Sequence, residues 1–179
     1  VAETLDFSHM HFCQGSIRDA LEVGSETQRA VEALGGTPDL LVALHACDTA
    51  TDEAIALGIL RGVPAMMVVP CCQAELAREL GPAAADNAPP ALIAHGRFRR
   101  AYADLLTDAL RVEVLEAAGY EVAVVEFVSS EHSAKNTLLR AQLTRRGKLS
   151  RARFDGVRGR CEALGVSLSL MRQLDAAIG

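Results

Sequence analysis

Residues 38–54, PDLLVALHACDTATDEA, decide the fold, because they predict a buried strand that passes into a helix through a polar turn. Five apolar residues, Leu40–Leu44, follow one another without a polar side chain, which is typical of a strand covered on both faces. Small and polar residues come next, and Thr51 is the expected N-cap of a helix over residues 51–61. A strand that leads into a helix in this way is half of a βαβ unit.

The rest of the chain repeats this alternation of strand and helix. Further strands are expected at residues 10–17, 63–69, 121–128 and 137–144, and further helices at 26–34, 73–80, 105–118 and 167–178. The sequence therefore predicts an α/β fold with a mostly parallel sheet and helices on both faces. Leu40–Leu44 should be its central strand, flanked by residues 10–17 and 63–69. The short connection at 129–136 has no room for a crossover helix, so the last two strands should pair antiparallel.

Composition restricts the class of protein. Half of the 179 residues are hydrophobic, which excludes disorder as the overall state. No run approaches the ~20 apolar residues that span a bilayer, so we expect no membrane partner. The net charge of −5 gives no overall footprint for nucleic acid. The five cysteines lack the spacing of a disulfide framework and favour a reducing, cytoplasmic setting.

Three motifs follow expected strands in chain order: HACDTATD at residues 45–52, PCC at 70–72 and SSEHSAKN at 129–136. Ligands in open α/β sheets bind beyond the carboxyl ends of parallel strands, so these turns lie where chemistry is expected. Together they resemble the family of S-adenosylmethionine-dependent methyltransferases that carry HACDTATD and PCCH turns. A family of tRNA ribose 2'-O-methyltransferases is similar at greater distance. Where the family has the His of PCCH, this chain has Gln73.

The resemblance implies a Rossmann-like methyltransferase sheet with an antiparallel last strand. Residues 1–146 would be the C-terminal portion of that domain, and 147–179 a basic and then helical extension. Residues 10–13 would be the third strand of the sheet, so that the first two strands would lie before Val1. The glycine-rich loop that grips the cofactor follows the first strand in this family, and no G-x-G occurs in the chain. We therefore expect this chain alone to bind S-adenosylmethionine weakly.

On the cofactor side, the resemblance assigns three residues. Ser16 would hydrogen-bond the adenine amine of S-adenosylmethionine, and Ile17 would pack on the adenine ring. Ala46 lies in the turn that would face the sulfonium. The family usually has Asp where this chain has Ser16.

On the acceptor side, the resemblance assigns Asp48 as the general base that takes a proton from an acceptor hydroxyl or amine. His45 lies in the same turn. In the last motif, Lys135 would stabilise developing negative charge and Asn136 would orient the acceptor.

The acceptor pocket itself would be shaped by Cys71, Cys72 and His132. We also expect Ser16, His45, Asp48, Cys71 and Lys135 to line one cleft, because each ends or follows a strand at the same sheet edge.

Two other functions stay open. His45, Cys47, Cys71, Cys72 and His132 are residue types that bind zinc, although no C-x-x-C is present, and we assign no metal ligand. A non-catalytic RNA-binding or scaffold domain would suit the basic segment 135–160, which holds nine of the eighteen Lys and Arg.

One pair of charged residues is expected to be structural only. Asp108 and Arg111 lie one helical turn apart and should form a surface ion pair worth a few tenths of a kcal/mol.

Overall fold

The computed structural model describes most of the chain. The described residues are 12–20, 24–33, 35, 37–44, 46–70, 73–81, 84, 87–126, 128, 131, 136–144 and 149–178.

The chain divides into two compact units, residues 1–37 and 38–179, which are described separately. The first unit holds a short 3-10 turn, η2 (Arg18–Ala20), and helix α1 (Glu26–Ala33). Ser25 caps α1, since its hydroxyl oxygen accepts the Gln28 N–H at 2.9 Å. The described residues at 12–17 form no strand, so the strand expected over 10–17 is not found there.

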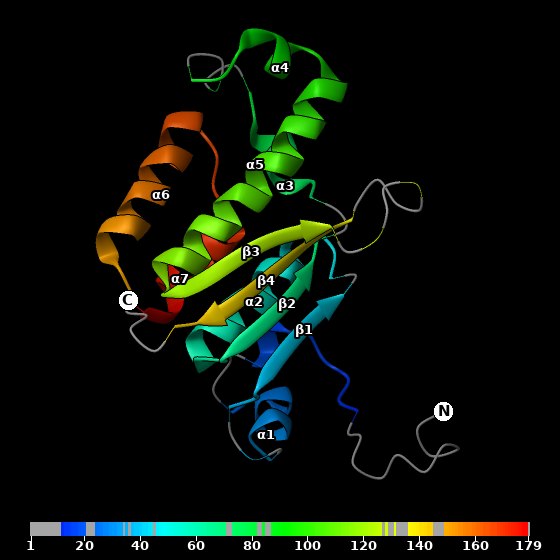
Figure 1. Cartoon of the computed structure of the whole chain (residues 1–179), viewed down its shortest axis with the longest axis vertical. Coiled ribbons are helices and arrows are strands. Elements are labelled where there is room, and N and C mark those ends of the chain that lie inside the picture. The colour runs from blue at the N-terminus through cyan, green and yellow to red at the C-terminus, as the bar shows by residue number, and fades with distance from the viewer. Residues whose placement is uncertain are drawn as a thin grey trace. The chain divides into compact units, whose positions relative to one another are not determined.

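The second unit is an α/β structure with four strands and six helices among its described residues (Figure 1). In chain order these are β1 (Leu40–Leu44), α2 (Thr49–Arg61), β2 (Ala65–Val69), α3 (Glu75–Glu79), α4 (Pro90–Ala94), α5 (Gly96–Ala117), β3 (Tyr120–Glu126), β4 (Thr137–Leu143), α6 (Arg151–Leu164) and α7 (Ser169–Ile178).

The sheet has the order β1-β2-β4-β3. Strands β1 and β2 are parallel, with Leu41 opposite Met66. Strand β4 is antiparallel to both of its neighbours, with Leu139 opposite Val68 on one side and Val124 on the other. The antiparallel pairing of the last two strands is confirmed.

The expected position of Leu40–Leu44 is wrong. Strand β1 is an edge strand of the described sheet, and only one of the three neighbouring pairs in it is parallel, so the predicted mostly parallel arrangement is not found. The physical reason lies in the pattern used for the prediction. An uninterrupted apolar run shows that a strand is compatible with burial on both faces, but it does not identify the neighbours that provide this burial.

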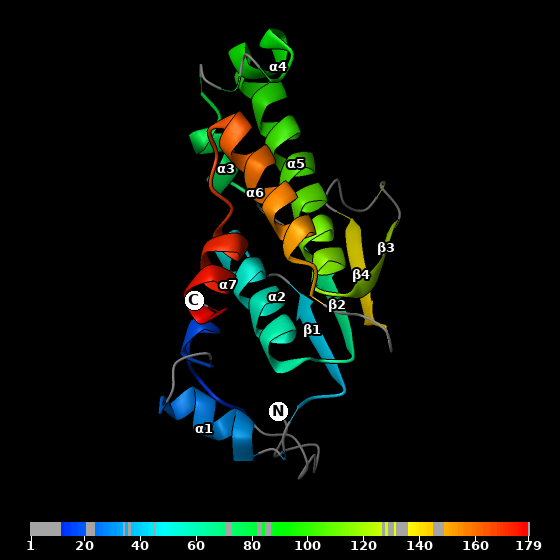
Figure 2. The same cartoon turned by 90° about the vertical axis from the view of Figure 1, so that its left-hand side faces the viewer.

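The described helices of the second unit that contact the sheet all cover one face of it, as Figure 2 shows with the sheet seen nearly edge-on. Met66, Val68, Leu139 and Ala141 point to this covered face, and each is at most 1% exposed. The prediction of helices on both faces is therefore wrong for the described part of this unit.

The other side, called the open face below, carries the alternate side chains of the same strands. Leu40, Val42 and Leu44 are 48%, 53% and 52% exposed there. Val125 of β3 is exposed on this side too, whereas its register partner Leu138 is buried.

Helix α2 lies close to the sheet because Gly58 faces Met66. A Cβ added to Gly58 would come within 2.2 Å of the Met66 Sδ atom, so a larger residue would require the Met66 side chain or the helix to shift. The helix ends as predicted, at Gly62, which adopts a left-handed conformation with φ 61°. It begins at Thr49, so the predicted N-cap role of Thr51 is wrong; the Thr51 hydroxyl instead donates to the Ala46 carbonyl oxygen.

Two helices differ from the sequence expectation. Helix α5 begins at Gly96, well before residue 105, so the basic residues Arg97, Arg99 and Arg100 belong to its first turns. Helix α6 is absent from the sequence prediction, because Gly156 and Gly159 lower its helix propensity. Its buried side chains follow helical spacing at Phe154, Val157, Cys161 and Leu164. No described helix has the length and apolar character needed to cross a membrane.

Candidate functional site

The candidate site of the second unit is built on the turns that follow β1 and β2. Because these strands are parallel, their carboxyl ends meet at the same edge of the sheet. The first turn includes Ala46–Asp48 and leads into α2, and the second includes Pro70 and Gln73 and leads into α3. This edge is where ligands bind in open α/β sheets.

Asp48 joins the two turns. Its Oδ1 atom accepts the backbone N–H groups of Ala74 and Glu75 at 3.0 and 3.1 Å, and its Oδ2 atom accepts Arg78 Nη2 at 3.2 Å. The first N–H groups of a helix have no partner within the helix, and a carboxylate stabilises that positive end. The Asp48 side chain therefore caps α3, a helix that it precedes by more than 20 residues. We call these contacts the Asp48 clamp.

The backbone of Asp48 adopts an uncommon conformation. Its φ and ψ are 53° and −119°, and it is the one non-glycine residue with positive φ in the described part of the chain. Such a conformation costs about 1–3 kcal/mol and persists where surrounding contacts enforce it. The clamp supplies those contacts.

The clamp also sets the acidity of Asp48. Partial burial alone would raise the pKa of this carboxyl, but hydrogen bonds from Ala74, Glu75 and Arg78 outweigh burial and lower the pKa below its usual value. A lower pKa makes the carboxylate a weaker base. The general-base role of Asp48 stays a prediction, and its observed role is to position α3.

A buried network lies behind the clamp and centres on Arg111 of α5. The Arg111 Nε atom donates to Asp52 Oδ1 at 2.7 Å, and both side chains are 1% exposed. Its other nitrogens donate to Asp108 Oδ1 and to the Asp48 carbonyl oxygen, each at 3.1 Å. Removing one partner of such a pair leaves an uncompensated buried charge, which costs about 3–5 kcal/mol. The predicted pairing of Asp108 with Arg111 is confirmed, but its surface location is wrong, because the Arg111 side chain is 1% exposed.

Gln73 extends this network to the second turn. It is 2% exposed, and its Nε2 atom donates to Asp108 Oδ1 at 2.6 Å. No local pattern in the sequence signals the roles of Gln73 and Asp52, because their partners on α5 are more than 30 residues away in the chain. Only the occurrence of Arg111 among apolar helix positions points toward burial.

Three other assigned residues are described. Asn136 is half-buried, and its Nδ2 atom donates to the Val128 carbonyl oxygen at 2.9 Å, across the connection between β3 and β4. Ala46 is partly buried, and its carbonyl oxygen accepts the Thr51 hydroxyl. In the first unit, the Ser16 hydroxyl oxygen accepts the Asp19 N–H, and the Ser16 N–H donates to Asp19 Oδ2, both at 3.1 Å. Ile17 follows there and is half-buried.

The remaining assigned residues, His45, Cys71, Cys72, His132 and Lys135, lie outside the described residues. The predicted common cleft therefore stays a prediction, as do the roles of these side chains. The zinc alternative also stays a prediction, since four of its five residues belong to this group. In the described part of the chain, no group of three or more His, Cys, Asp or Glu is placed to hold a metal ion.

Residues 1–79 match a family model whose description is methyltransferase domain. The match covers fewer than half of the 179 residues and includes β1, α2, β2 and α3. It supports a methyltransferase domain in this part of the chain, which confirms the predicted resemblance at that level. Neither a curated protein nor a solved structure matches the chain.

Proposed function

We propose that this chain contributes to an S-adenosylmethionine-dependent methyltransferase, in which it forms the acceptor side of the active site. The observation that carries the proposal is the methyltransferase-domain match over residues 1–79. The matched range includes both turns that the Asp48 clamp joins. When bound, S-adenosylmethionine would supply the methyl group from its positively charged sulfonium sulfur.

The residues of this chain would contribute chiefly by positioning. Methyl transfer requires the acceptor atom to lie in line with the methyl group, and misplacement by about 1 Å can cost a hundredfold in rate. Asp48 fixes α3 against the first turn, and Arg111 fixes both Asp52 and the Asp48 carbonyl group. Two turns that are fixed in this way would hold an acceptor between them.

The described residues do not fit the whole cofactor. Neither β1 nor β2 is followed by a glycine-rich turn of the kind that cradles a cofactor's charged end. Ser16 and Ile17 offer an exposed hydroxyl and a half-buried apolar side chain, which suit adenine alone. We therefore expect this chain to bind the cofactor weakly.

RNA is the acceptor that we propose, although the basic segment 135–160 supports it less than expected. Arg158 pairs with Asp175 at 2.9 Å, and Arg160 pairs with Glu113. Arg151 and Arg153 of α6 are exposed. Paired arginines attract phosphate less, so we expect the main phosphate contacts to come from arginines outside this segment.

The test combines binding and transfer with the full chain. Calorimetric titration with S-adenosylmethionine should show weak but saturable binding that S-adenosylhomocysteine displaces. Incubation with methyl-labelled cofactor and total RNA should give label that ribonuclease releases. Asp48→Ala should reduce methyl transfer to RNA more than it reduces cofactor binding, because it frees α3. Asp155 is an exposed residue of α6, and Asp155→Ala should change neither methyl transfer nor cofactor binding.

Two outcomes would count against the proposal. Absence of displaceable cofactor binding would contradict cofactor use by this chain. RNA binding without cofactor binding would favour the non-catalytic RNA-binding domain instead.

A further inference from the structure

We propose that a pocket between α3 and the first turns of α5 binds a backbone phosphate of the RNA acceptor. The pocket has a volume of about 350 Å³ and is lined by Ala74, Ala77, Arg78, Gly96, Arg99 and Arg100. The inference rests on the proposed function, because it names how the acceptor of that same site is held. It does not depend on the basic segment 135–160.

The lining of the pocket selects for an anion. Of the described residues that line it, three are arginines, the other three are Ala or Gly, and none is a carboxylate. Gly96, Arg99 and Arg100 have the i, i+3, i+4 spacing that places them on one face of α5. A Cβ added at Gly96 would meet nothing within 4 Å, so the wall is open at that point.

The arginines retain hydrogen-bonding capacity for a ligand. Arg78 donates Nη2 to Asp48, and its side chain is 65% exposed. Arg99 donates to the Ile93 carbonyl oxygen at a long 3.4 Å, and Arg100 is exposed. Among the described residues, no carboxylate pairs with Arg99 or Arg100. A guanidinium carries five N–H donors in a planar fork that matches phosphate oxygens.

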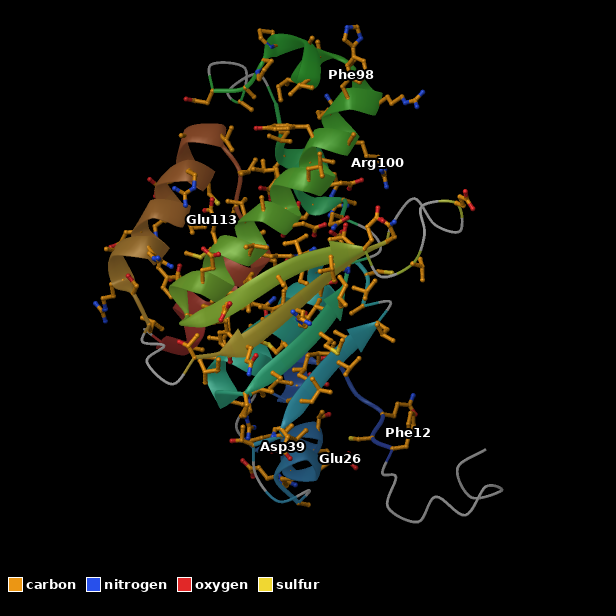
Figure 3. The ribbon with its side chains drawn as sticks, in the orientation of Figure 1. Phe12, Glu26, Asp39, Phe98, Arg100 and Glu113 are labelled. Atoms are coloured by element: carbon orange, nitrogen blue, oxygen red, sulfur yellow. The ribbon has the colours of Figure 1, made fainter. Side chains whose placement is uncertain are left out.

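The pocket adjoins the candidate site through Arg78. This residue lines the pocket and also contacts Asp48 Oδ2, so a phosphate in the pocket would lie next to the clamp. Figure 3 shows Arg100 extending from the N-terminal part of α5, whereas Glu113 lies further along the same helix. The acceptor would thus be anchored beside the two turns that are expected to position its reacting atom.

RNA fits this surface better than a small phosphorylated molecule. Arg97 is exposed on the adjoining part of the first turn of α5. A second phosphate of the same RNA strand could therefore contact its guanidinium. The chain as a whole carries a net charge of −5, so a local basic patch is needed to attract a polyanion. A mononucleotide would use only the pocket.

The experiment measures the fluorescence anisotropy of a labelled single-stranded RNA on the full chain, without cofactor, over a series of salt concentrations. The double variant Arg99→Ala/Arg100→Ala should weaken binding about 100-fold, which is about tenfold for each charge-assisted hydrogen bond that the variant removes. The salt dependence of log K should become shallower by about 1.4, because each phosphate contact to a single strand contributes about 0.7. The matched control Arg151→Ala/Arg153→Ala removes two exposed arginines from α6 and should weaken binding less than about threefold.

Further arms separate the alternatives. Arg99→Lys/Arg100→Lys keeps the charge and loses the fork, so it should restore binding in part. An unchanged unfolding midpoint would verify that the variants fold. Unchanged RNA binding by the pocket variant, or an equal loss in the control, would overturn the proposal. Adenosine monophosphate that binds as tightly as the RNA would overturn the choice of RNA.

Failure here is distinguishable from failure of the proposed function. Calorimetric binding of S-adenosylmethionine should be the same for the wild type and the pocket variant. If the pocket variant leaves RNA binding unchanged while the chain still binds the cofactor, only this inference fails. If no form binds the cofactor, the proposed function fails, and the pocket result stands by itself.

Discussion

Both faces of the sheet carry apolar side chains, but the surroundings of those side chains differ greatly. On the covered face, Met66 and Leu139 are fully buried beneath helices. On the open face, Val42 and Leu44 of an equally apolar strand are about half exposed. The difference shows that the apolar content of a strand measures its capacity for burial, while the helices packed on each side determine whether burial occurs.

The largest expected effect comes from breaking the network that holds α5 over the covered face. Arg111→Ala should lower the free energy of unfolding by about 3–5 kcal/mol, because it leaves Asp52 charged, buried and unpaired. Urea denaturation measures this loss. Arg97→Ala, an exposed arginine on the same helix, is the control and should change stability by less than about 0.5 kcal/mol. An equally small loss for Arg111→Ala would show that the network contributes little.

A matched pair of leucines tests the comparison directly. Leu139→Ala on the covered face should cost about 2–5 kcal/mol, because it leaves a cavity under the helices. Leu44→Ala removes the same atoms from the open face, where half of the side chain already contacts water, and should cost about 1 kcal/mol or less. Equal losses in chemical denaturation would show that the open face is covered in solution.

The carboxyl edge of the sheet should respond to pH through Asp48. Its pKa is lowered in the folded state, so the clamp stabilises the fold above the unfolded pKa of about 3.8, and this contribution disappears as pH falls through the folded pKa. Asp48→Asn keeps an oxygen that accepts the Ala74 and Glu75 N–H groups but carries no charge. The variant should therefore lose less stability than the wild type as pH falls below about 3.8. Parallel denaturation curves for the two proteins across that range would contradict this assignment.

The smallest effect is expected on the open face itself. Val42→Thr should change the free energy of unfolding by less than about 0.5 kcal/mol, since Val42 is 53% exposed. It should nevertheless reduce binding of a hydrophobic fluorescent dye, which reports exposed apolar surface. The inverse pattern, a large loss of stability with unchanged dye binding, would mean that Val42 is packed against another surface.

Local sequence patterns predict which helices and strands form in this fold better than they predict which elements lie next to one another. The uninterrupted apolar run predicts β1 correctly, Gly62 marks the end of α2, and the short connection after β3 predicts the antiparallel pairing. Each of these signals acts within a few residues. The edge position of β1 cannot be predicted in this way, because it depends on segments far away in the chain.

The candidate site shows the same limit. The motif places Asp48 at the carboxyl edge of the sheet. The clamp, however, joins Asp48 to Ala74 and Glu75, which lie 26 and 27 positions further along the chain. By sequence spacing, Arg111 resembles half of an exposed i, i+3 pair, and only the tertiary contact with Asp52 reveals that it is buried. The three arginines of the pocket come from two helices, so no single stretch of sequence contains that signal.

The close approach of Gly58 to Met66 has a consequence for reaction kinetics. Met66 is fully buried against α2, while the next residue, Met67, is partly exposed on the open face. Peroxide should therefore convert the Met67 thioether to its sulfoxide directly, whereas Met66 can react only after α2 separates from the sheet. The oxidation rate of Met66 thus reports the opening of α2, and the rate of Met67 serves as the reference for a side chain that needs no opening. Measuring both rates by mass spectrometry would show how often the helix separates from the sheet.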